Sequence, residues 1–525
     1  MAEGTGTGWT PKANPWLIAF VVALAAFMEI LDTSIANVAL PYIAGNVGAS
    51  GDESTWVLTS YLVSNAIVLP LGGWVAGLIG RKRFFMACIV LFTISSVLCG
   101  FAASLGLLIL FRVIQGAGGG GLQPMAQAIL ADTFPLEKRG LAFAVFGITA
   151  VTAPAIGPTL GGWITDNYSW RWIFFINVPV GALTLFLVSR LVEDPPYLAA
   201  RRNAGVRIDY TGIALLVIGV GALQIMLDRG QEDDWFGSSF IVALAAIAVT
   251  CLVALVVWEW FRKHPVIEVR LLRNLNFLIA NLMMFMMGAV LFSSVVLLPQ
   301  LLQSLMGYSA ESAGFALSAG GIVLMLVMPA VGQISGRILA RHLIAFGWLL
   351  LAGAMYYTVR HLDLLIGFND AAWLRIVQAI GIPFVFVPLT IVAYVGIAPE
   401  KSNSISGMLN FMRNIGSSVG TSLVTTMVAQ RAQVHQVTLS AHATMFNPSF
   451  RAAVDSLSRR IAAGGLDSAG RARAFAIVYR SIISQATILA YVDTFALLGV
   501  AAAVMFVLTF ALKRNPLDGR PVAVE

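Results

Sequence analysis

The sequence predicts an all-α integral membrane protein with fourteen spans, and its composition, its long apolar runs and an internal repeat all support that prediction. Of the 525 residues, 58% are hydrophobic and only 11% are charged. A soluble domain carries about 25% charged residues, so this composition excludes a soluble fold. A helix needs about 20 mainly apolar residues to cross about 30 Å of hydrocarbon, and fourteen runs of the chain reach that length.

Each run is one expected transmembrane helix, and most of the connections between runs are short. We expect spans near 16–43, 54–78, 84–103, 106–130, 140–165, 170–192, 210–228, 238–261, 275–303, 311–335, 340–360, 370–396, 403–430 and 490–512. The first run is too long for the core of a signal peptide and contains two acids, so we expect it to be retained.

The formal net charge of +7 is explained by membrane topology and not by nucleic-acid binding. With the N-terminus inside, the cytoplasmic segments contain most of the 33 Lys and Arg, including the cluster at 81–83. Short outer loops contain only Arg171, Arg229 and Arg360. Basic residues favour the cytoplasmic side of membrane proteins, so both termini are predicted to be cytoplasmic.

Cysteine and histidine indicate no metal site. Cys88, Cys99 and Cys251 lie within expected spans, where apolar packing is their expected role. The five histidines fall in loops or at the ends of helices, and no nucleotide-binding signature occurs. We therefore expect no cofactor, and buried proton chemistry is left to carboxylates.

The first span is the one run with acids near its middle, Glu29 and Asp32. A charged side chain at the centre of a bilayer costs about 2.5–3.5 kcal/mol on insertion scales, so such an acid is a functional candidate. The spacing of three places both on one helix face, about one turn apart. Burial and a neighbouring like charge disfavour the ionised form, and interacting acids titrate as a pair. We expect the pair to carry protons; structural acids bonded to Thr33, Asn37 or a facing helix are the alternative.

An internal repeat divides the chain into two similar halves. The pattern Arg112-x-x-Gln115-x-x-Gly recurs from Arg375 at an offset of 263 residues, and the glycine pattern at 73–77 recurs at 332–336. Both copies preserve orientation, so an even number of spans separates them. We predict a six-helix bundle at 1–195, an inserted helix pair at 196–270, and a second six-helix bundle at 271–525 with a long periplasmic segment at 431–489.

Five local motifs in the expected order resemble one transporter family. They are LDTSIANVALP at 31–41, RVIQG at 112–116, GPTLGG at 157–162, WRWIFFINVP at 170–179 and LQIMLDRG at 223–230. Together with the six-plus-six arrangement, they resemble the major facilitator superfamily and, within it, the fourteen-helix drug:proton antiporters of the EmrB/QacA type. The resemblance covers nearly the whole chain.

The resemblance assigns conformational roles to two glycine motifs. Gly157, Pro158, Gly161 and Gly162 match the antiporter motif of the fifth helix, and Gly73, Gly77 and Arg81 match the cytoplasmic loop motif. In the second motif Gly77 stands where the superfamily usually has Asp, so the latch attributed to that Asp is in doubt. Arg81 to Arg83 are then expected to act mainly as topology anchors.

Arg112 lies in the middle of a span and needs a partner, because a guanidinium cannot lose its proton. The resemblance makes the first and fourth helices neighbours, so a charge-assisted bond from Arg112 to Asp32 or Glu29 is expected. A fixed pairing with backbone carbonyls is the alternative. Arg375 lies near the outer end of its span, where snorkelling to the interface is expected.

The glycines at 116 and 118–121 exceed what ordinary helix packing requires. Small residues allow close helix approach in lipid, so we expect this segment to pack against the glycines and prolines at 153–162 of the fifth span. A phosphate-binding loop is excluded because no Gly-Lys-Ser or Gly-Lys-Thr follows.

Substrate contacts are expected from buried amides and from the methionines at 283–287. Lipid-facing or core packing is the alternative for each methionine. The candidates are Asn37, Gln123, Gln127, Asn281, Met284, Gln300, Gln378, Asn410 and Arg413.

The resemblance implies proton-driven multidrug efflux across a bacterial inner membrane, with hydrophobic or amphipathic substrates. Asp32, with Glu29, would take a proton from the periplasm, and the drug would bind after its release inside. The resemblance also implies an EmrA-like periplasmic adaptor and a TolC-like outer-membrane channel, which the segment 431–489 permits. A dedicated exporter of a fatty acid, siderophore or other metabolite is the alternative; an importer is disfavoured by GPTLGG, and an enzyme by the lack of any nucleophile–base constellation.

Overall fold

The computed structural model describes residues 11–196, 208–262, 265–463 and 470–513, and over these residues the chain forms helices without any strand. Both chain ends, whose cytoplasmic location is predicted, lie partly outside the described residues, and so do residues 197–207, which follow the predicted domain boundary at 195–196.

The N-terminal bundle contains six spans, two of which are broken into shorter helices. Its helices are α1 (Pro15–Val47), α2 (Gly51–Ile79), α3 (Arg81–Gly100), α4 (Leu105–Gly119), α5 (Leu122–Thr133), α6 (Leu136–Asn167), α7 (Trp172–Phe175) and α8 (Asn177–Leu191). Helices α4 and α5 together form the span 105–133, and α7 and α8 form the span 172–191.

An inserted pair and a second bundle follow. The pair is α10 (Tyr210–Arg229) and α11 (Ser239–Phe261), with the 3₁₀ turn η1 (Trp235–Gly237) between them. The second bundle contains η2 (Val269–Arg273), α12 (Leu275–Ser304), α13 (Ala310–Ile334), α14 (Ala340–His361), α15 (Phe368–Ala393), η3 (Pro399–Lys401), α16 (Ser402–His442), α17 (Pro448–Ala463) and α18 (Gly470–Thr509).

Local sequence signals explain where many of these helices begin. The Asn14 side chain accepts a bond from Trp16 N at the start of α1, and Ser50 and Glu53 form a capping box at the start of α2. These side chains satisfy backbone donors that a helix start leaves unpaired. Gly80, at φ 95°, separates α2 from α3, and this backbone conformation favours glycine.

The number of spans agrees with the prediction except at one polar helix. Among the described residues, twelve helices are long and apolar enough to cross a membrane, and the bent pair within α6 makes thirteen. Pro154 and Pro158 lie inside α6, which explains the bend. The predicted span at 403–430 falls in α16, which is too polar to be among those helices but packs along α2, α12 and α18 within the bundle.

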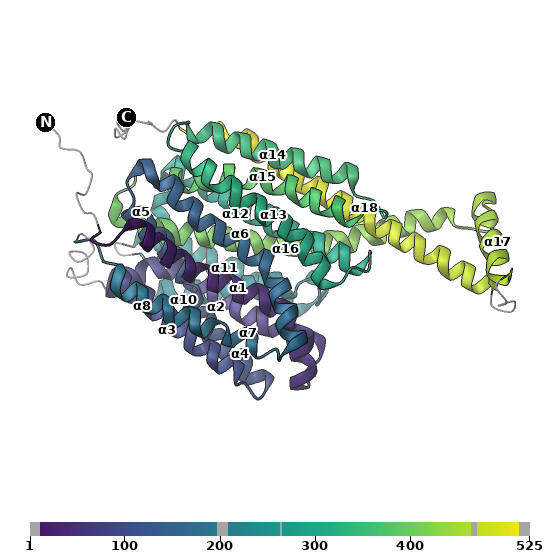
Figure 1. Cartoon of the computed structure of the whole chain (residues 1–525), viewed down its shortest axis with the longest axis horizontal. Helices are drawn as coiled ribbons and strands as arrows, with labels where there is room; N and C mark the ends of the chain where they lie inside the picture. Colours follow the sequence, from purple (N-terminus) through teal and green to yellow (C-terminus); the bar gives the residue numbers. More distant parts are fainter. Residues whose placement is uncertain (1–10, 197–207, 263–264, 464–469, 514–525) are drawn as a thin grey trace.

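The two bundles meet along two antiparallel seams (Figure 1). Helices α6 and α13 form the first seam, where a Cβ on Gly332 would lie 2.8 Å from the carbonyl oxygen of Gly140. Helices α2 and α16 form the second, where a Cβ on Gly73 would lie 2.9 Å from the carbonyl oxygen of Asn403. Both close approaches lie toward the predicted cytoplasmic side, so the bundles are in contact there.

The inserted helix α10 packs between the bundles along the outer part of the second seam. It contributes Leu216 and Val220 to an apolar cluster that also contains Ala66 of α2 and Ile415 of α16. Gln224 Nε2 donates to Ser418 Oγ of α16 at 2.8 Å. On the other side of α10, Thr59 of α2 hydrogen-bonds to Asp228, and Arg229 Nη1 donates to Thr55 Oγ1. The inserted pair is therefore attached to both bundles.

Helices α16 and α18 continue well beyond the bundle, and α17 lies across the end of this projection (Figure 1). This projection corresponds to the long segment predicted at 431–489, of which 464–469 lie outside the described residues. At its base, Asp493 of α18 accepts bonds from Arg431 Nε and His435 Nε2 of α16, both at 2.8 Å.

The predicted packing of the α4–α5 glycines against α6 is wrong. A Cβ on Gly120 would lie 2.6 Å from the carbonyl oxygen of Asn65 in α2, and one on Gly118 would lie 2.7 Å from the backbone of Phe92 in α3. Gly157 and Gly161 of α6 instead pack on α1, where a Cβ on Gly161 would contact Ile35 at 3.1 Å. Sequence spacing indicated that close approaches occur but not which helices make them.

Candidate functional site

Asp32 is held in a buried cage of donors inside the N-terminal bundle. Its side chain is almost fully buried, and Arg112 Nη1 of α4 donates to Oδ2 at 2.6 Å. Gln115 Nε2 and Asn177 Nδ2 donate to Oδ1 at 3.0 and 2.7 Å. A charge-assisted bond of this length is strong, and both partners are out of contact with solvent. The expected bond between Arg112 and the acid pair is therefore present, and it involves Asp32.

The Arg112 side chain is itself fixed from several sides. Nε donates to the carbonyl oxygen of Val57 at 3.0 Å, and Nη1 also donates to Gln115 Oε1 at 2.8 Å. The guanidinium lies 4.3 Å from the ring centroid of Tyr61, close enough for a cation–π interaction. The pair with Asp32 is consequently a rigid part of the bundle in this conformation.

Glu29 is one turn away but has different partners. It is also buried, and its Oε1 accepts bonds from Tyr61 Oη at 3.1 Å and Asn65 Nδ2 at 3.0 Å. Its Oε2 accepts a bond from Gln123 Nε2. All three donors are neutral, so among the described residues no cation bonds directly to this carboxylate. The two acids share a helix face, as predicted, yet only Asp32 forms an ion pair.

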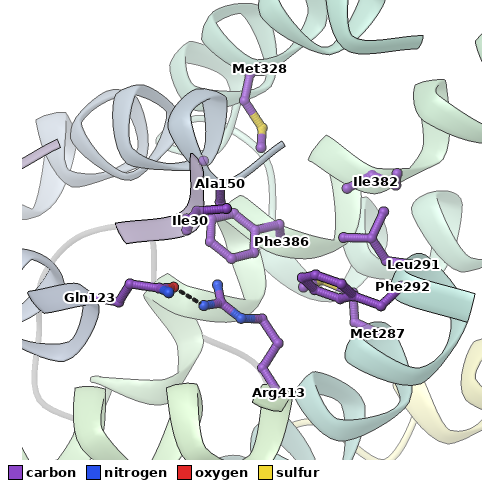
Figure 2. Close-up of a pocket in the computed structure, with 11 residues that line it drawn as sticks. Ile30, Gln123, Ala150, Met287, Leu291, Phe292, Met328, Ile382, Phe386 and Arg413 are labelled. Atoms are coloured by element: carbon purple, nitrogen blue, oxygen red, sulfur yellow. Dashed lines mark hydrogen bonds between the residues drawn. The ribbon is translucent and has the colours of Figure 1, made fainter. Parts of the chain in front are cut away.

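Two consecutive hydrogen bonds between side chains link Glu29 to the opposite bundle. Gln123 donates to Glu29 through its amide nitrogen and accepts a bond from Arg413 Nη2 of α16 through its oxygen (Figure 2). Gln123 belongs to α5 in the first bundle and Arg413 to the second. The charge of Glu29 is thus connected by one amide to a cation across the centre of the molecule.

Gln123 and Arg413 line a central cavity of about 40 Å³ between the bundles. The rest of its wall is apolar, and Figure 2 shows Met328 and Phe386 on it. The lining residues are Ile30, Gln123, Gly147, Ala150, Met287, Leu291, Phe292, Met328, Ile382, Phe386 and Arg413. Drug-sized ligands occupy about 300–1,000 Å³, so this cavity is contracted and must widen to bind one.

A second, smaller cavity of about 10 Å³ adjoins the first inside the C-terminal bundle. Met287, Leu291 and Ile382 line both cavities. Ser294 and Gln378 are also among the residues that line the second cavity. The central space therefore extends toward the interior of the second bundle.

Three of the nine predicted substrate contacts line these cavities: Gln123 and Arg413 line the first, and Gln378 lines the second. The other six do not. Asn37 and Gln300 are exposed, Gln127 and Asn410 bond to each other at 2.8 Å, Asn281 bonds to the backbone of its own helix, and Met284 is buried in the core. A polar or thioether side chain in the sequence does not indicate how its helix is rotated. The rotation of the helix decides which of its side chains face the cavity.

The predicted conformational residues also have different surroundings. Gly157 and Gly161 allow α6 to approach α1 closely, and Gly73 allows α2 to approach α16. A Cβ on Gly77 or Gly162 would meet nothing within 4 Å, so packing does not require glycine there. Pro158 lies inside α6, beside the bend.

Arg81 is buried and links the bundles, which corrects the expectation that it acts mainly as a topology anchor. Nη1 donates to Asp132 Oδ2 of α5 at 2.5 Å, and Nη2 donates to Ser402 Oγ of α16 at 3.0 Å. The cytoplasmic loop motif has Gly77 in place of its usual Asp, and here Asp132 provides the carboxylate that pairs with Arg81. We call Arg81, Asp132 and Ser402 the inner latch.

Several functional contacts were not predicted. Tyr61 and Asn65 of α2 bind Glu29, and Asn177 binds Asp32. Asn177 lies in the motif at 170–179, but the only sequence signal of Tyr61 and Asn65 is a polar side chain within an apolar run, which many non-functional positions share. Among the described residues, no group of three or more His, Cys, Asp or Glu is placed to hold a metal ion.

Two helical bundles that enclose a central cavity with buried charges define a transporter of the alternating-access kind. Residues 22–421 match the sequence model described as Major Facilitator Superfamily. The proton:xylose symporter XylE has a similar fold, with a TM-score of 0.60 and 14% identity over 95% of this chain and 96% of that chain. The chain therefore belongs to the major facilitator superfamily.

Within that superfamily, the chain is similar to multidrug export proteins of the EmrB type. EmrB of Escherichia coli (strain K12) is 40% identical over 83% of this chain and 84% of that protein. EmrB of Haemophilus influenzae is 43% identical over 82% and 84%. The fatty acid resistance protein FarB of Neisseria gonorrhoeae is 37% identical over 84% and 86%. This family membership agrees with the resemblance inferred from the five motifs.

Proposed function

We propose that the protein exports hydrophobic and amphipathic drugs across a bacterial inner membrane in exchange for protons. The similarity to EmrB proteins supports the multidrug role. The observation that carries the coupling is the chain Glu29–Gln123–Arg413, which connects a buried acid of one bundle to the cavity wall of the other. No cofactor other than the coupling proton is required.

Glu29 and Asp32 have unequal roles in this proposal. Protonation of Asp32 would leave the buried charge of Arg112 without its anion, and breaking a buried pair costs about 3–5 kcal/mol. Protonation of Glu29 leaves no directly bonded cation unpaired, because its partners are neutral donors. Glu29 is therefore the group that exchanges protons in each cycle. Asp32, held by Arg112, fixes the helix that carries Glu29.

Proton and drug compete through the charge of the central cavity. With Glu29 ionised, its charge balances that of Arg413, and the cavity suits neutral or cationic drugs. With Glu29 protonated, the cavity carries the charge of Arg413 alone, and a cationic drug is expelled. A ligand shifts only the conformations that it distinguishes, so this difference couples the two fluxes. When a neutral drug is exchanged for one proton, a membrane potential of about 100 mV contributes about 2.3 kcal/mol, which sustains roughly a 50-fold drug gradient.

Alternating access requires the contacts on the cytoplasmic side to open. The inner latch and the bond between Gln127 and Asn410 hold the bundles together on that side. Uptake of drug from the cytoplasm therefore begins with separation of Arg81 from Ser402. Both chain ends are expected on this side of the membrane.

Partners beyond the membrane are part of the same proposal. The projection of α16, α17 and α18 extends the molecule on the side expected to be periplasmic (Figure 1). It carries exposed apolar side chains, including Val437, Phe446 and Tyr479. We assign this surface to an EmrA-like adaptor that leads to a TolC-like outer-membrane channel.

The alternative is a dedicated exporter of a fatty acid or another metabolite by the same machinery. The name of the FarB relative and the apolar wall of the central cavity support it. Efflux assays with matched cationic, neutral and anionic compounds separate the two functions, because a dedicated exporter transports only one class.

The decisive experiment measures drug-dependent proton flux in proteoliposomes with an imposed pH step and an internal pH dye. Glu29→Gln keeps the size and polarity of the side chain but cannot exchange a proton. We expect this variant to lose drug-dependent proton flux and uphill efflux while it still binds neutral drugs. Gln300→Glu, which adds an acid at an exposed position, is the control for a change of charge away from the site. Uphill efflux at the wild-type rate in Glu29→Gln would refute the assignment.

A further inference from the structure

The sequence repeat extends to the donor cages of the two bundles. In the N-terminal bundle, Arg112 and Gln115 of α4 surround Asp32 of α1. Asn177 connects that carboxylate to Ser96 Oγ of α3 at 3.0 Å. The carboxylate is thus held by a guanidinium and two amides, one of which also bonds to a hydroxyl.

The C-terminal bundle repeats the guanidinium, one amide and the hydroxyl of this cage without the carboxylate. Arg375 and Gln378 of α15 lie 263 residues after Arg112 and Gln115. Arg375 Nη1 donates to Ser294 Oγ of α12 at 3.1 Å and to Gln378 Oε1 at 3.4 Å. Gln378 Nε2 donates to Thr358 Oγ1 of α14 at 3.0 Å. Ser294 and Thr358 lie 262 residues after Asp32 and Ser96, so a serine stands where the first bundle has its acid.

Within the part of the chain that the structure describes, no acid is bonded to Arg375. Its side chain is 3% exposed, so it does not snorkel as the sequence position had suggested. Among the described residues, its bonding partners are the neutral groups of Ser294 and Gln378. A buried cation that cannot lose its proton is costly without an anion. By comparison, Arg112 in the equivalent place has its anion at 2.6 Å.

The free part of the guanidinium has the form that binds a carboxylate. Both hydrogen bonds use Nη1, and Nε is buried without a partner. Nε and Nη2 together form a planar fork that matches two carboxylate oxygens. Helix α13 passes this edge at Gly320, where a Cβ would lie 3.3 Å from Nε, so a larger residue there would crowd it.

The cavities connect this cage to the central site. Ser294 and Gln378, which both contact Arg375, line the second cavity, and that cavity shares Met287 and Leu291 with the central one. About 10 Å³ admits no more than one water molecule, so the space must widen together with the central cavity. An amphiphile whose apolar part lies among Met287 and Leu291 would then place its head group at Arg375.

We propose that Arg375, with Ser294 and Gln378, is an anion-binding subsite for the carboxylate of an amphiphilic substrate. The proposal rests on the proposed export function and names a substrate class for it. The second bundle supplies the cation of the repeated cage, and the substrate supplies the anion that Asp32 supplies in the first. Exported molecules then include amphiphilic carboxylates as well as neutral and cationic drugs.

The test places a carboxylate of the protein itself beside Arg375. Ser294→Asp restores the acid of the first bundle and satisfies Arg375 internally, while Ser294→Asn adds nearly the same volume without charge. Binding of dodecanoate, dodecan-1-ol and ethidium is measured on the full chain in nanodiscs, without any proton gradient. We expect Ser294→Asp to weaken dodecanoate binding roughly 10- to 100-fold. Ser294→Asn should weaken it far less, and dodecan-1-ol and ethidium should bind both variants as they bind wild type.

A second variant addresses the cation itself. Arg375→Met should also lose affinity for dodecanoate while it retains binding of ethidium, which shows that the chain is folded. Equal dodecanoate affinity in wild type, Ser294→Asp and Arg375→Met would overturn the subsite. Equal losses for dodecanoate and dodecan-1-ol would also overturn it, because they would indicate a structural role. Chloride that binds in a Ser294→Asp-sensitive way, without affecting dodecanoate, would assign the cage to an inorganic ion instead.

Failure of this proposal is distinguishable from failure of the proposed function. Proton-coupled ethidium efflux by wild type, combined with unchanged dodecanoate binding in the variants, would reject only the subsite. Dodecanoate binding that depends on Arg375, combined with ethidium efflux that is independent of the proton gradient, would reject only the coupling.

Discussion

At the residue scale, two acids one turn apart are placed in different electrostatic environments. Asp32 is bonded to Arg112, whereas Glu29 is bonded to three neutral donors and reaches Arg413 only through Gln123. The sequence favoured Asp32 as the main proton carrier because it lies in the family motif. The structure changes this balance, since a proton on Asp32 would leave a buried guanidinium unpaired.

Asp32→Asn should reduce the stability of the protein. The substitution leaves Arg112 buried without its anion. We expect a loss of about 3–5 kcal/mol in the free energy of unfolding, measured by denaturation in mixed micelles. The double variant Asp32→Asn with Arg112→Met should recover much of that loss because it contains no unpaired charge. A double variant less stable than Asp32→Asn would contradict this account of the pair.

At the scale of helices, glycines determine which pairs approach most closely. Helices α12 and α16 cross where a Cβ on Gly420 would lie 2.5 Å from the backbone of Ala289. Nearby, Gly416 faces the backbone of Phe285, and Gly288 faces that of Arg413. Because Arg413 lines the central cavity, this crossing sets the position of a functional side chain. Small residues allow such contacts in a bilayer, where packing replaces the hydrophobic effect between helices.

Gly416→Ala should separate α12 from α16 and displace Arg413. The new Cβ would overlap backbone atoms, which cannot move as a flexible side chain can. We expect a loss of about 1–3 kcal/mol in unfolding free energy, together with weaker drug binding. Gly353→Ala in α14 is the matched control, since a Cβ there meets nothing within 4 Å. If both variants were equally stable, close packing at this crossing would not be needed.

At the scale of the whole molecule, contacts between the bundles define the conformation. The inner latch joins α3, α5 and α16 on the side expected to be cytoplasmic. On the outer part of the α2–α16 seam, α10 lies between the bundles and bonds to both. The bundles are thus in direct contact at one end of this seam and bridged by an inserted helix at the other. Any rocking motion must break the first set of contacts and carry α10 with it.

Arg81→Ala should favour the inward-open conformation because it removes the link to Asp132 and Ser402. Accessibility is measured by the labelling rate of Gln127→Cys, a buried position, with a membrane-impermeant thiol reagent in inside-out vesicles of a variant whose native cysteines are replaced. We expect faster labelling in Arg81→Ala than in the parent. Arg83→Ala, in the same basic cluster but exposed, should not change the rate. Equal rates in all three proteins would show that the latch does not hold the inner side closed.

Much of the candidate site was readable from the chain because some of its signals are local. An acid within an apolar run is costly wherever it lies, so Glu29 and Asp32 were identifiable without a structure. Their common helix face followed from a spacing of three. By contrast, Tyr61 and Asn65 had no distinguishing local pattern, and the motif at 170–179 did not indicate that its Asn177 bonds to Asp32, since these roles depend on the rotation of other helices. For the same reason, Asn37 and Gln300 were expected at the site but are exposed.

The sequence by itself determined that this protein is a helical membrane transporter built of two repeated bundles with an inserted pair. These properties can be read from hydropathy and periodicity because each span must be apolar and must hydrogen-bond its own backbone within the bilayer. Only the tertiary structure decided that Arg112 bonds to Asp32 and that Gln123 hydrogen-bonds to both Glu29 and Arg413. It also decided that, among the described residues, Arg375 is bonded to no anion. These pairings depend on how helices rotate and cross, which is set by packing among residues far apart in the chain.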